Sequence, residues 1–227
     1  MMWNPSKNLT RCSRCGAPEA VLVRRYSGEA LCRRCLRASL LTRMRRFVSK
    51  NNLLSRNDHI LMLRTELPYD KELSSLFFEM ESEFPVSIDS AKLGFHSREE
   101  IPEMLREAVE FFSFRREKVI LPLILDDVVS LLMRFIFTGS PDFLIISGRL
   151  HIALSKIENF VSPFVEVPLE EILALCGDRC REVGTPNDPY LKMVEELERD
   201  SPGIRFNLLR FTERTDFLRA IGVRSDQ

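Results

Sequence analysis

Two Cys-x-x-Cys pairs, Cys12-Ser-Arg-Cys15 and Cys32-Arg-Arg-Cys35, stand near the start of the sequence, separated by the sixteen residues 16–31. Four thiolates at this spacing suit one tetrahedral zinc ion, because each pair turns two sulfurs toward the same point. Short apolar runs on either side of a turn containing Gly28 predict a small β-hairpin between the pairs. The pattern therefore predicts a zinc ribbon with a structural metal, since four cysteine ligands leave no open coordination position. Two disulfides or a redox pair are the alternatives.

Length and composition indicate a folded protein. The chain has 227 residues, of which 44% are hydrophobic, enough for one domain of ordinary size beside the small metal module. It contains no run of eighteen apolar residues, and the first seven residues lack a long apolar core. We therefore expect neither a membrane span nor secretion, but a soluble cytoplasmic protein.

The formal net charge of zero hides a basic head on an acidic body. Residues 1–50 hold twelve Lys and Arg against two acidic residues, whereas the remainder holds 21 basic and 31 acidic residues. Closely spaced arginines gain affinity for phosphates by releasing condensed counterions. We therefore predict that the head binds nucleic acid; the alternative is that it docks on acidic protein surface. The candidate nucleic-acid-binding residues are Arg24, Arg25, Arg33, Arg34, Arg37, Arg43, Arg45 and Arg46.

Hydrophobic periodicity predicts the rest of the organisation. After Cys35, apolar residues recur at helical spacing and predict a linking helix with arginines on its other faces. From residue 59, short apolar runs alternate with amphipathic helical stretches, which is typical of a parallel sheet flanked by helices. We expect a last strand at 164–167 and a closing pair of helices. The predicted division is a zinc ribbon at 1–36, a basic linking helix at 37–56, an α/β domain at 57–185 and a helical pair at 186–227.

Three stretches of the body resemble the tRNA thiolases of the adenine-nucleotide alpha hydrolase, or PP-loop, superfamily. They are Leu125-Asp126-Asp127 at a helix start, residues 161–172 and residues 195–210. The resemblance implies a PP-loop-like α/β domain that binds tRNA and serves the 2-thiolation of tRNA uridine. It also implies that Asp127 lies near the nucleotide site.

The sequence departs from this family at the residues that carry its chemistry. Active members have a Ser-Gly-Gly-x-Asp-Ser loop after the first strand of the body, whereas residues 64–72 contain a proline and no glycine. Active members also hold a Cys-x-x-Cys that, with a later cysteine, binds an iron–sulfur cluster or handles sulfur. Outside the head this chain has two cysteines, Cys176 and Cys180, too few for three cluster ligands. We therefore expect neither ATP binding in the family's way nor an iron–sulfur cluster.

The remaining catalytic candidates are weak. Cys176 and Cys180 lie one helical turn apart and could handle sulfur or close a disulfide, but no histidine motif stands beside them, which favours inert thiols. Asp126 and Asp127 are expected to cap the helix that follows them. Paired glutamates such as Glu170-Glu171 are interpreted as helix starts and solvated faces.

These observations predict a catalytically degenerate tRNA-thiolase homologue. It would bind tRNA through the zinc ribbon and the arginines, and support an active PP-loop paralogue as a heterodimer, or act as a homodimer. This arrangement resembles the cytosolic tRNA thiolase pair, in which one of two homologous subunits has lost the ATP loop. The alternatives are an active ATP-dependent tRNA sulfurtransferase that uses Cys176 and Cys180, a zinc-ribbon nucleic-acid-binding regulator, and a protein-binding adaptor.

Overall fold

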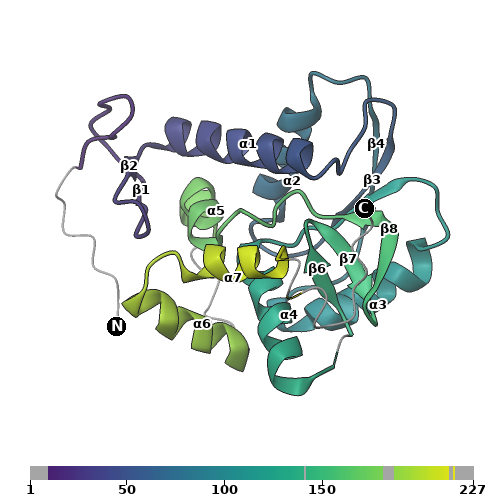
Figure 1. Cartoon of the computed structure of the whole chain (residues 1–227). Helices are drawn as coiled ribbons and strands as arrows, with labels where there is room; N and C mark the ends of the chain where they lie inside the picture. Colours follow the sequence, from purple (N-terminus) through teal and green to yellow (C-terminus); the bar gives the residue numbers. More distant parts are fainter. Residues whose placement is uncertain (1–9, 141, 181–186, 215–216, 218–227) are drawn as a thin grey trace.

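The structure, a computed structural model, describes residues 10–140, 142–180, 187–214 and 217, and consists of a small hairpin, a long helix and an α/β body (Figure 1). The helices are α1 (Arg33–Lys50), α2 (Asp70–Glu81), α3 (Ile101–Phe112), α4 (Leu125–Thr138), α5 (Leu169–Cys176), α6 (Pro189–Asp200) and α7 (Ile204–Thr212), with 3-10 turns η1 (Arg98–Glu100) and η2 (Gly177–Cys180). The strands are β1 (Leu22–Val23), β2 (Ala30–Leu31), β3 (His59–Arg64), β4 (Ser87–Lys92), β5 (Lys118–Ile120), β6 (Leu144–Ile146), β7 (Arg149–Ile152) and β8 (Ser155–Val161).

The central sheet has the strand order β4-β3-β5-β8-β7-β6, and its first four strands are parallel. This confirms the predicted α/β class. The last two strands are antiparallel, because two-residue turns join β6 to β7 and β7 to β8. Positive φ angles at Ser147, Gly148, Ala153 and Leu154 give these turns the twist that tight hairpins need.

The strand predicted at 164–167 is wrong. These residues form a turn in which the Val167 N–H donates to the Phe164 carbonyl at 2.8 Å, and β8 lies earlier, at Ser155–Val161. Phe164, Val165 and Val167 are fully buried, so their apolar character reflects packing rather than strand pairing. Short apolar runs do not distinguish these two cases.

Helices cover both faces of the sheet (Figure 1). On one side α1, α2 and α5 pack against one another, while α4 lies on the other side and packs against α6 and α7. The predicted inward stripe of the linking helix is confirmed, since Leu36, Leu40, Met44 and Phe47 are buried. None of the described helices is long and apolar enough to cross a membrane. The parts of the last helix predicted around Leu218 and Ile221 lie outside the described residues.

Candidate metal centre and sheet-edge site

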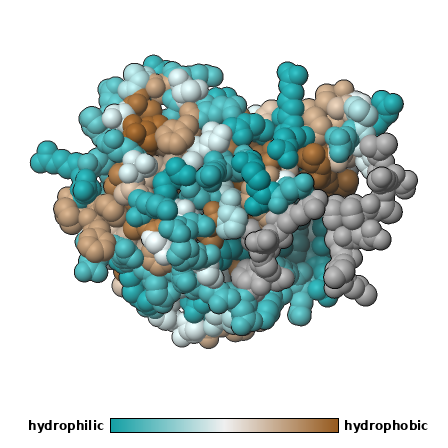
Figure 2. Space-filling view, turned by 180° about the vertical axis from the view of Figure 1, so that it is seen from behind, coloured by the Kyte–Doolittle hydropathy of each residue, from teal (hydrophilic) through white to brown (hydrophobic). Residues whose placement is uncertain are grey.

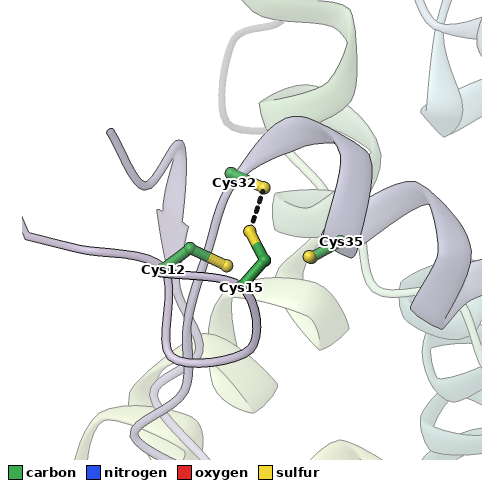
Figure 3. A group of neighbouring side chains, drawn as sticks. All are labelled: Cys12, Cys15, Cys32 and Cys35. Carbon is green, nitrogen blue, oxygen red and sulfur yellow. Dashed lines mark hydrogen bonds between the residues drawn. The ribbon is translucent and has the colours of Figure 1, made fainter. Parts of the chain in front are cut away.

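The four N-terminal cysteines converge on one point (Figure 3). Cys12 and Cys15 come from the turn before the hairpin, and Cys32 and Cys35 from the start of α1. Their Sγ atoms all lie within 4.8 Å of one another, and those of Cys15 and Cys32 are 3.6 Å apart. A zinc ion with Zn–S bonds of about 2.3 Å would hold its sulfurs about 3.8 Å apart, so the group fits a tetrahedral thiolate site.

The electrostatics of the cluster favour a thiolate at one position. A backbone N–H from Cys32 lowers the pKa of Cys12 to about 6. The thiol of Cys15 raises the pKa of Cys35 to about 12, because neighbouring sulfurs cannot all carry negative charge together. A divalent cation would offset this repulsion, as metal-bound thiols are deprotonated.

The hairpin is fixed to the body by a buried ion-pair network around Glu171. Glu171 is fully buried in α5 and accepts from Arg24 Nη2 at 2.7 Å and from the Tyr26 hydroxyl at 2.6 Å. Arg43 of α1 donates to the Tyr26 hydroxyl at 2.6 Å and lies 3.3 Å from Glu171. Burial raises the pKa of Tyr26, so its hydroxyl stays a donor to the carboxylate. This network holds the metal module against α5.

The candidate arginines therefore divide into two groups. Arg24 is 2% exposed and faces Glu171, so in this structure its guanidinium is not available to a phosphate. Arg37 is bound to Glu79 at 2.6 Å, and Arg45 reaches Glu83 at 3.5 Å. Four candidates are exposed and have no side-chain hydrogen bond or ion pair with another described residue: Arg25, Arg33, Arg34 and Arg46. These four are the free guanidinium groups of the predicted set.

The turn after β3 is closed by its own side chains. Asp70, at the start of α2, accepts from the Thr65 N–H at 2.9 Å and from Arg64 Nε at 2.6 Å. The backbone N–H of Thr65, which points toward the start of α2, is thereby already occupied by a protein carboxylate. A pocket of about 430 Å³ remains beside this turn, with Lys71, Lys92 and Arg179 among its lining residues.

The next part of the same sheet edge is filled by a buried polar cluster. Asp127 caps α4, because it accepts from the Ile124 N–H at 3.0 Å, and it also accepts from Arg98 Nε at 2.7 Å. Burial raises the pKa of Asp127, although the Arg98 guanidinium opposes the shift. Tyr69 is fully buried, and within the described structure its hydroxyl has no hydrogen-bond partner. Asp126 accepts from the Leu169 N–H at 2.8 Å and pairs with Arg205 at 2.9 Å.

Cys176 and Cys180 are joined by a disulfide at the end of α5. Both residues are buried, and Cys176 lines the pocket beside the turn after β3. Two inert thiols were expected here, and the structure instead shows a disulfide, which the spacing of the two cysteines also allowed. The disulfide lies next to the pocket at the sheet edge. It is distant in sequence from the four N-terminal cysteines.

Sequence reasoning missed two central residues. Glu171 was interpreted as part of a solvated face, yet it is buried and anchors the metal module. The signal was its position four residues before the buried Leu175, which places it on the inward face of α5. Arg98 was not singled out, and it provides the counter-charge to Asp127. No local pattern predicts that pairing, because the two residues are 29 apart in sequence.

Two comparisons with known proteins found similarity to tRNA thiolases. Residues 11–37 match the family model described as 2-thiouridine synthetase TtuA, N-terminal LIM domain. The structure is similar to that of the U34-tRNA thiolase NcsA from Methanococcus maripaludis with its [4Fe-4S] cluster, with a TM-score of 0.63 and 13% identity over 95% of this chain and 88% of that chain. No curated protein matches this sequence. Both matches support the resemblance to tRNA thiolases, the first for the cysteine module and the second for the fold.

The expectation that the chain holds no iron–sulfur cluster is contradicted. The similar thiolase structure carries a [4Fe-4S] cluster, and the four N-terminal cysteines of this chain form a group that could hold a metal. Cluster ligands were expected only among the cysteines of the body, Cys176 and Cys180. Four cysteine thiolates are also the usual ligand set of iron–sulfur clusters, so the head needed to be counted too.

Proposed function

We propose that this chain binds tRNA and supports 2-thiolation of tRNA uridine as a catalytically degenerate member of the tRNA-thiolase family. The two matches to tRNA thiolases support the reaction class. The proposal depends most on one contrast within the molecule. At the sheet edge Asp70 occupies the Thr65 N–H and a buried polar cluster surrounds Asp127, whereas the head keeps four exposed guanidinium groups that have no partner among the described residues.

The four-cysteine group is proposed to hold a structural zinc ion that fixes the shape of the head. The Sγ separations suit tetrahedral coordination, and with all four positions taken by thiolates the ion would not activate water or substrate. The bound ion would neutralise part of the thiolate charge. It would thereby hold Arg33 and Arg34, which lie between Cys32 and Cys35, at a defined surface.

The active partner is proposed to be a PP-loop paralogue. In this arrangement the paralogue contributes the nucleotide chemistry, and this chain contributes RNA-binding surface. A second copy of this chain is the alternative partner, and the oligomeric state of the purified protein separates the two.

The RNA-binding surface is tested by removing free arginines and comparing the result with removal of paired ones. The variant Arg34→Ala/Arg46→Ala removes two exposed guanidinium groups from α1 that have no described protein partner. The control Arg14→Ala/Arg37→Ala removes the same charge from residues paired with Glu29 and Glu79. We expect tRNA affinity to fall about tenfold or more in the first variant, and the slope of log affinity against log salt to fall by about 2. Equal losses in both variants would contradict the assignment of the contact residues.

The disulfide favours a second candidate function, an active tRNA sulfurtransferase. Cys176 lies at the pocket beside the turn after β3. After reduction of the Cys176–Cys180 bond by an external thiol, the Cys176 thiolate would be placed to attack the outer sulfur of a donor persulfide, which would pass to Cys176 while the donor leaves as a thiolate. Loss of thiolation in a Cys176→Ser variant that retains its metal and its tRNA affinity would favour this function. Unchanged thiolation would favour the noncatalytic role.

A further inference from the structure

A pocket of about 380 Å³ lies at the end of the molecule remote from both candidate sites. It is formed by the second half of α1, the loop that enters β3 and the C-terminal end of α2. The sheet-edge site follows the carboxyl end of β3, whereas this pocket precedes the start of that strand. Apolar side chains reach the surface in separate patches among charged ones (Figure 2). Here Val48, Leu54, Met80 and Phe84, together with polar residues, line an open hollow of the size that small-molecule sites have.

The pocket contains a carboxylate that the protein does not satisfy. Glu81 is 6% exposed, and within the described structure its side chain has no hydrogen bond or ion pair. It lies four residues after the buried Phe77, on the inward face of α2. It is also the last residue of that helix, where the helix dipole disfavours negative charge. Burial raises its pKa, although the charge of the Arg45 guanidinium, which lines the same pocket without pairing with Glu81, opposes the shift.

A buried carboxylate without a hydrogen-bond donor destabilises the fold, and a ligand that donates hydrogen bonds to it would remove that destabilisation. The chemistry of the other lining residues indicates which further groups the ligand would carry. Phe84 is 40% exposed, and Val48 and Leu54 are further apolar residues that line the pocket. Arg56 lines the same pocket, is exposed and has no ion pair within the described residues. Arg45 lines it as well, and its contact with Glu83 is long, at 3.5 Å.

We infer that this pocket binds a guanine nucleotide unit, with the base on Glu81 and the phosphate at Arg45 and Arg56. Guanine presents two adjacent N–H donors, N1–H and the 2-amino group, which match the two oxygens of one carboxylate. Adenine, cytosine and uracil each place an acceptor beside the donor on that edge, and it would oppose the second oxygen. Phe84 supplies the ring on which the base packs, and the guanidinium groups neutralise the phosphate.

The unit could be free GMP or a guanosine of an RNA, since both present the same chemistry. The inference does not rest on the proposed function, because it uses neither the four cysteines nor the free arginines of the head. A nucleotide bound here would not contact the closed turn after β3.

The test is titration of the full-length protein with GMP, AMP, CMP and UMP, with binding monitored by calorimetry or ligand-observed NMR. We expect GMP to bind at least tenfold more tightly than the other three. Glu81→Gln should weaken GMP binding at least tenfold, because the amide places an N–H₂ group against the donors of the base. Glu103→Gln is the control, since Glu103 is 59% exposed on α3 and does not line this pocket, and it should bind GMP as the wild type does.

Three outcomes of this titration would contradict guanine binding. No GMP binding by the wild type at millimolar concentration, equal binding of the four nucleotides, or unchanged binding by Glu81→Gln would overturn it. Circular dichroism shows whether Glu81→Gln is folded, and loss of a buried charge should leave its melting temperature equal or higher. If GMP binds, competition with tRNA identifies the source: displacement indicates an RNA guanosine, and simultaneous binding indicates the free nucleotide.

Discussion

Replacing Arg24 by methionine removes the positive charge that the hairpin places on Glu171 while keeping a side chain of similar length. Arg24 and Glu171 are 2% and 0% exposed, so the substitution leaves a carboxylate buried beside α1 and α5. Breaking a buried pair by removing one partner costs about 3–5 kcal/mol. Tyr26 and Arg43 still donate to Glu171, at 2.6 and 3.3 Å, which places the expected loss near the lower end, at about 3 kcal/mol.

The assay is unfolding by urea and by heat, monitored by circular dichroism, with the metal site loaded. For a chain of this size a loss of about 3 kcal/mol corresponds to a fall in melting temperature of about 6–12 °C. A double-mutant cycle with Glu171→Gln isolates the pair, and we expect the double variant to be more stable than the sum of the single losses predicts. Arg14→Met is the control, because Arg14 forms an exposed pair with Glu29 and should cost less than about 1 kcal/mol. A loss below about 1 kcal/mol in Arg24→Met, or no coupling in the cycle, would refute the role of this network in holding the metal module.

Four further predictions follow from the same contacts. Cys15→Ser should lose the bound metal, and elemental analysis should find zinc in the wild type, whereas iron with acid-labile sulfide would assign a cluster instead. Asp127→Asn should lower the free energy of unfolding by about 3 kcal/mol, because Arg98 is left buried without its counter-charge; a loss within 0.5 kcal/mol of zero would contradict this. Glu81→Gln should be more stable than the wild type at pH 7, and the difference should vanish below pH 4.5: burial raises the pKa of Glu81 above 4.5, so the wild type loses stability as the pH rises through that pKa. Cys176→Ser should cost about 2 kcal/mol in unfolding without reductant and much less with it, because the disulfide closes only a short loop; equal losses in both conditions would exclude the bond.

The parts of the fold that follow a local period were predictable from the sequence. The inward stripe of α1 and the alternation of strands and helices from β3 to α4 depend on spacings of a few residues, and the structure confirms both. The direction of the last strands was not predictable, because the turn between β7 and β8 consists of Ala153 and Leu154, which rarely adopt positive φ. Sequence composition gives little warning of such a turn.

The candidate site was predictable only where ligands are close in sequence. The cysteine spacing led directly to four sulfurs around one point. Charge alone could not separate Arg34, which is free, from Arg24, which is buried, because the difference lies in Glu171, 147 residues further on. The same limit applies to Glu81, whose environment comes from α1 and the loop before β3. Long-range contacts decide which charged side chains are available for function.

The most direct test of the proposed role is purification of the tagged chain from its own host at moderate salt, with identification of what accompanies it. Mass spectrometry and RNA sequencing should find a PP-loop paralogue and tRNA, and the purified complex should form 2-thiouridine while the chain alone does not. A chain that arrives without RNA and without a PP-loop protein, or that thiolates tRNA alone, would contradict the account.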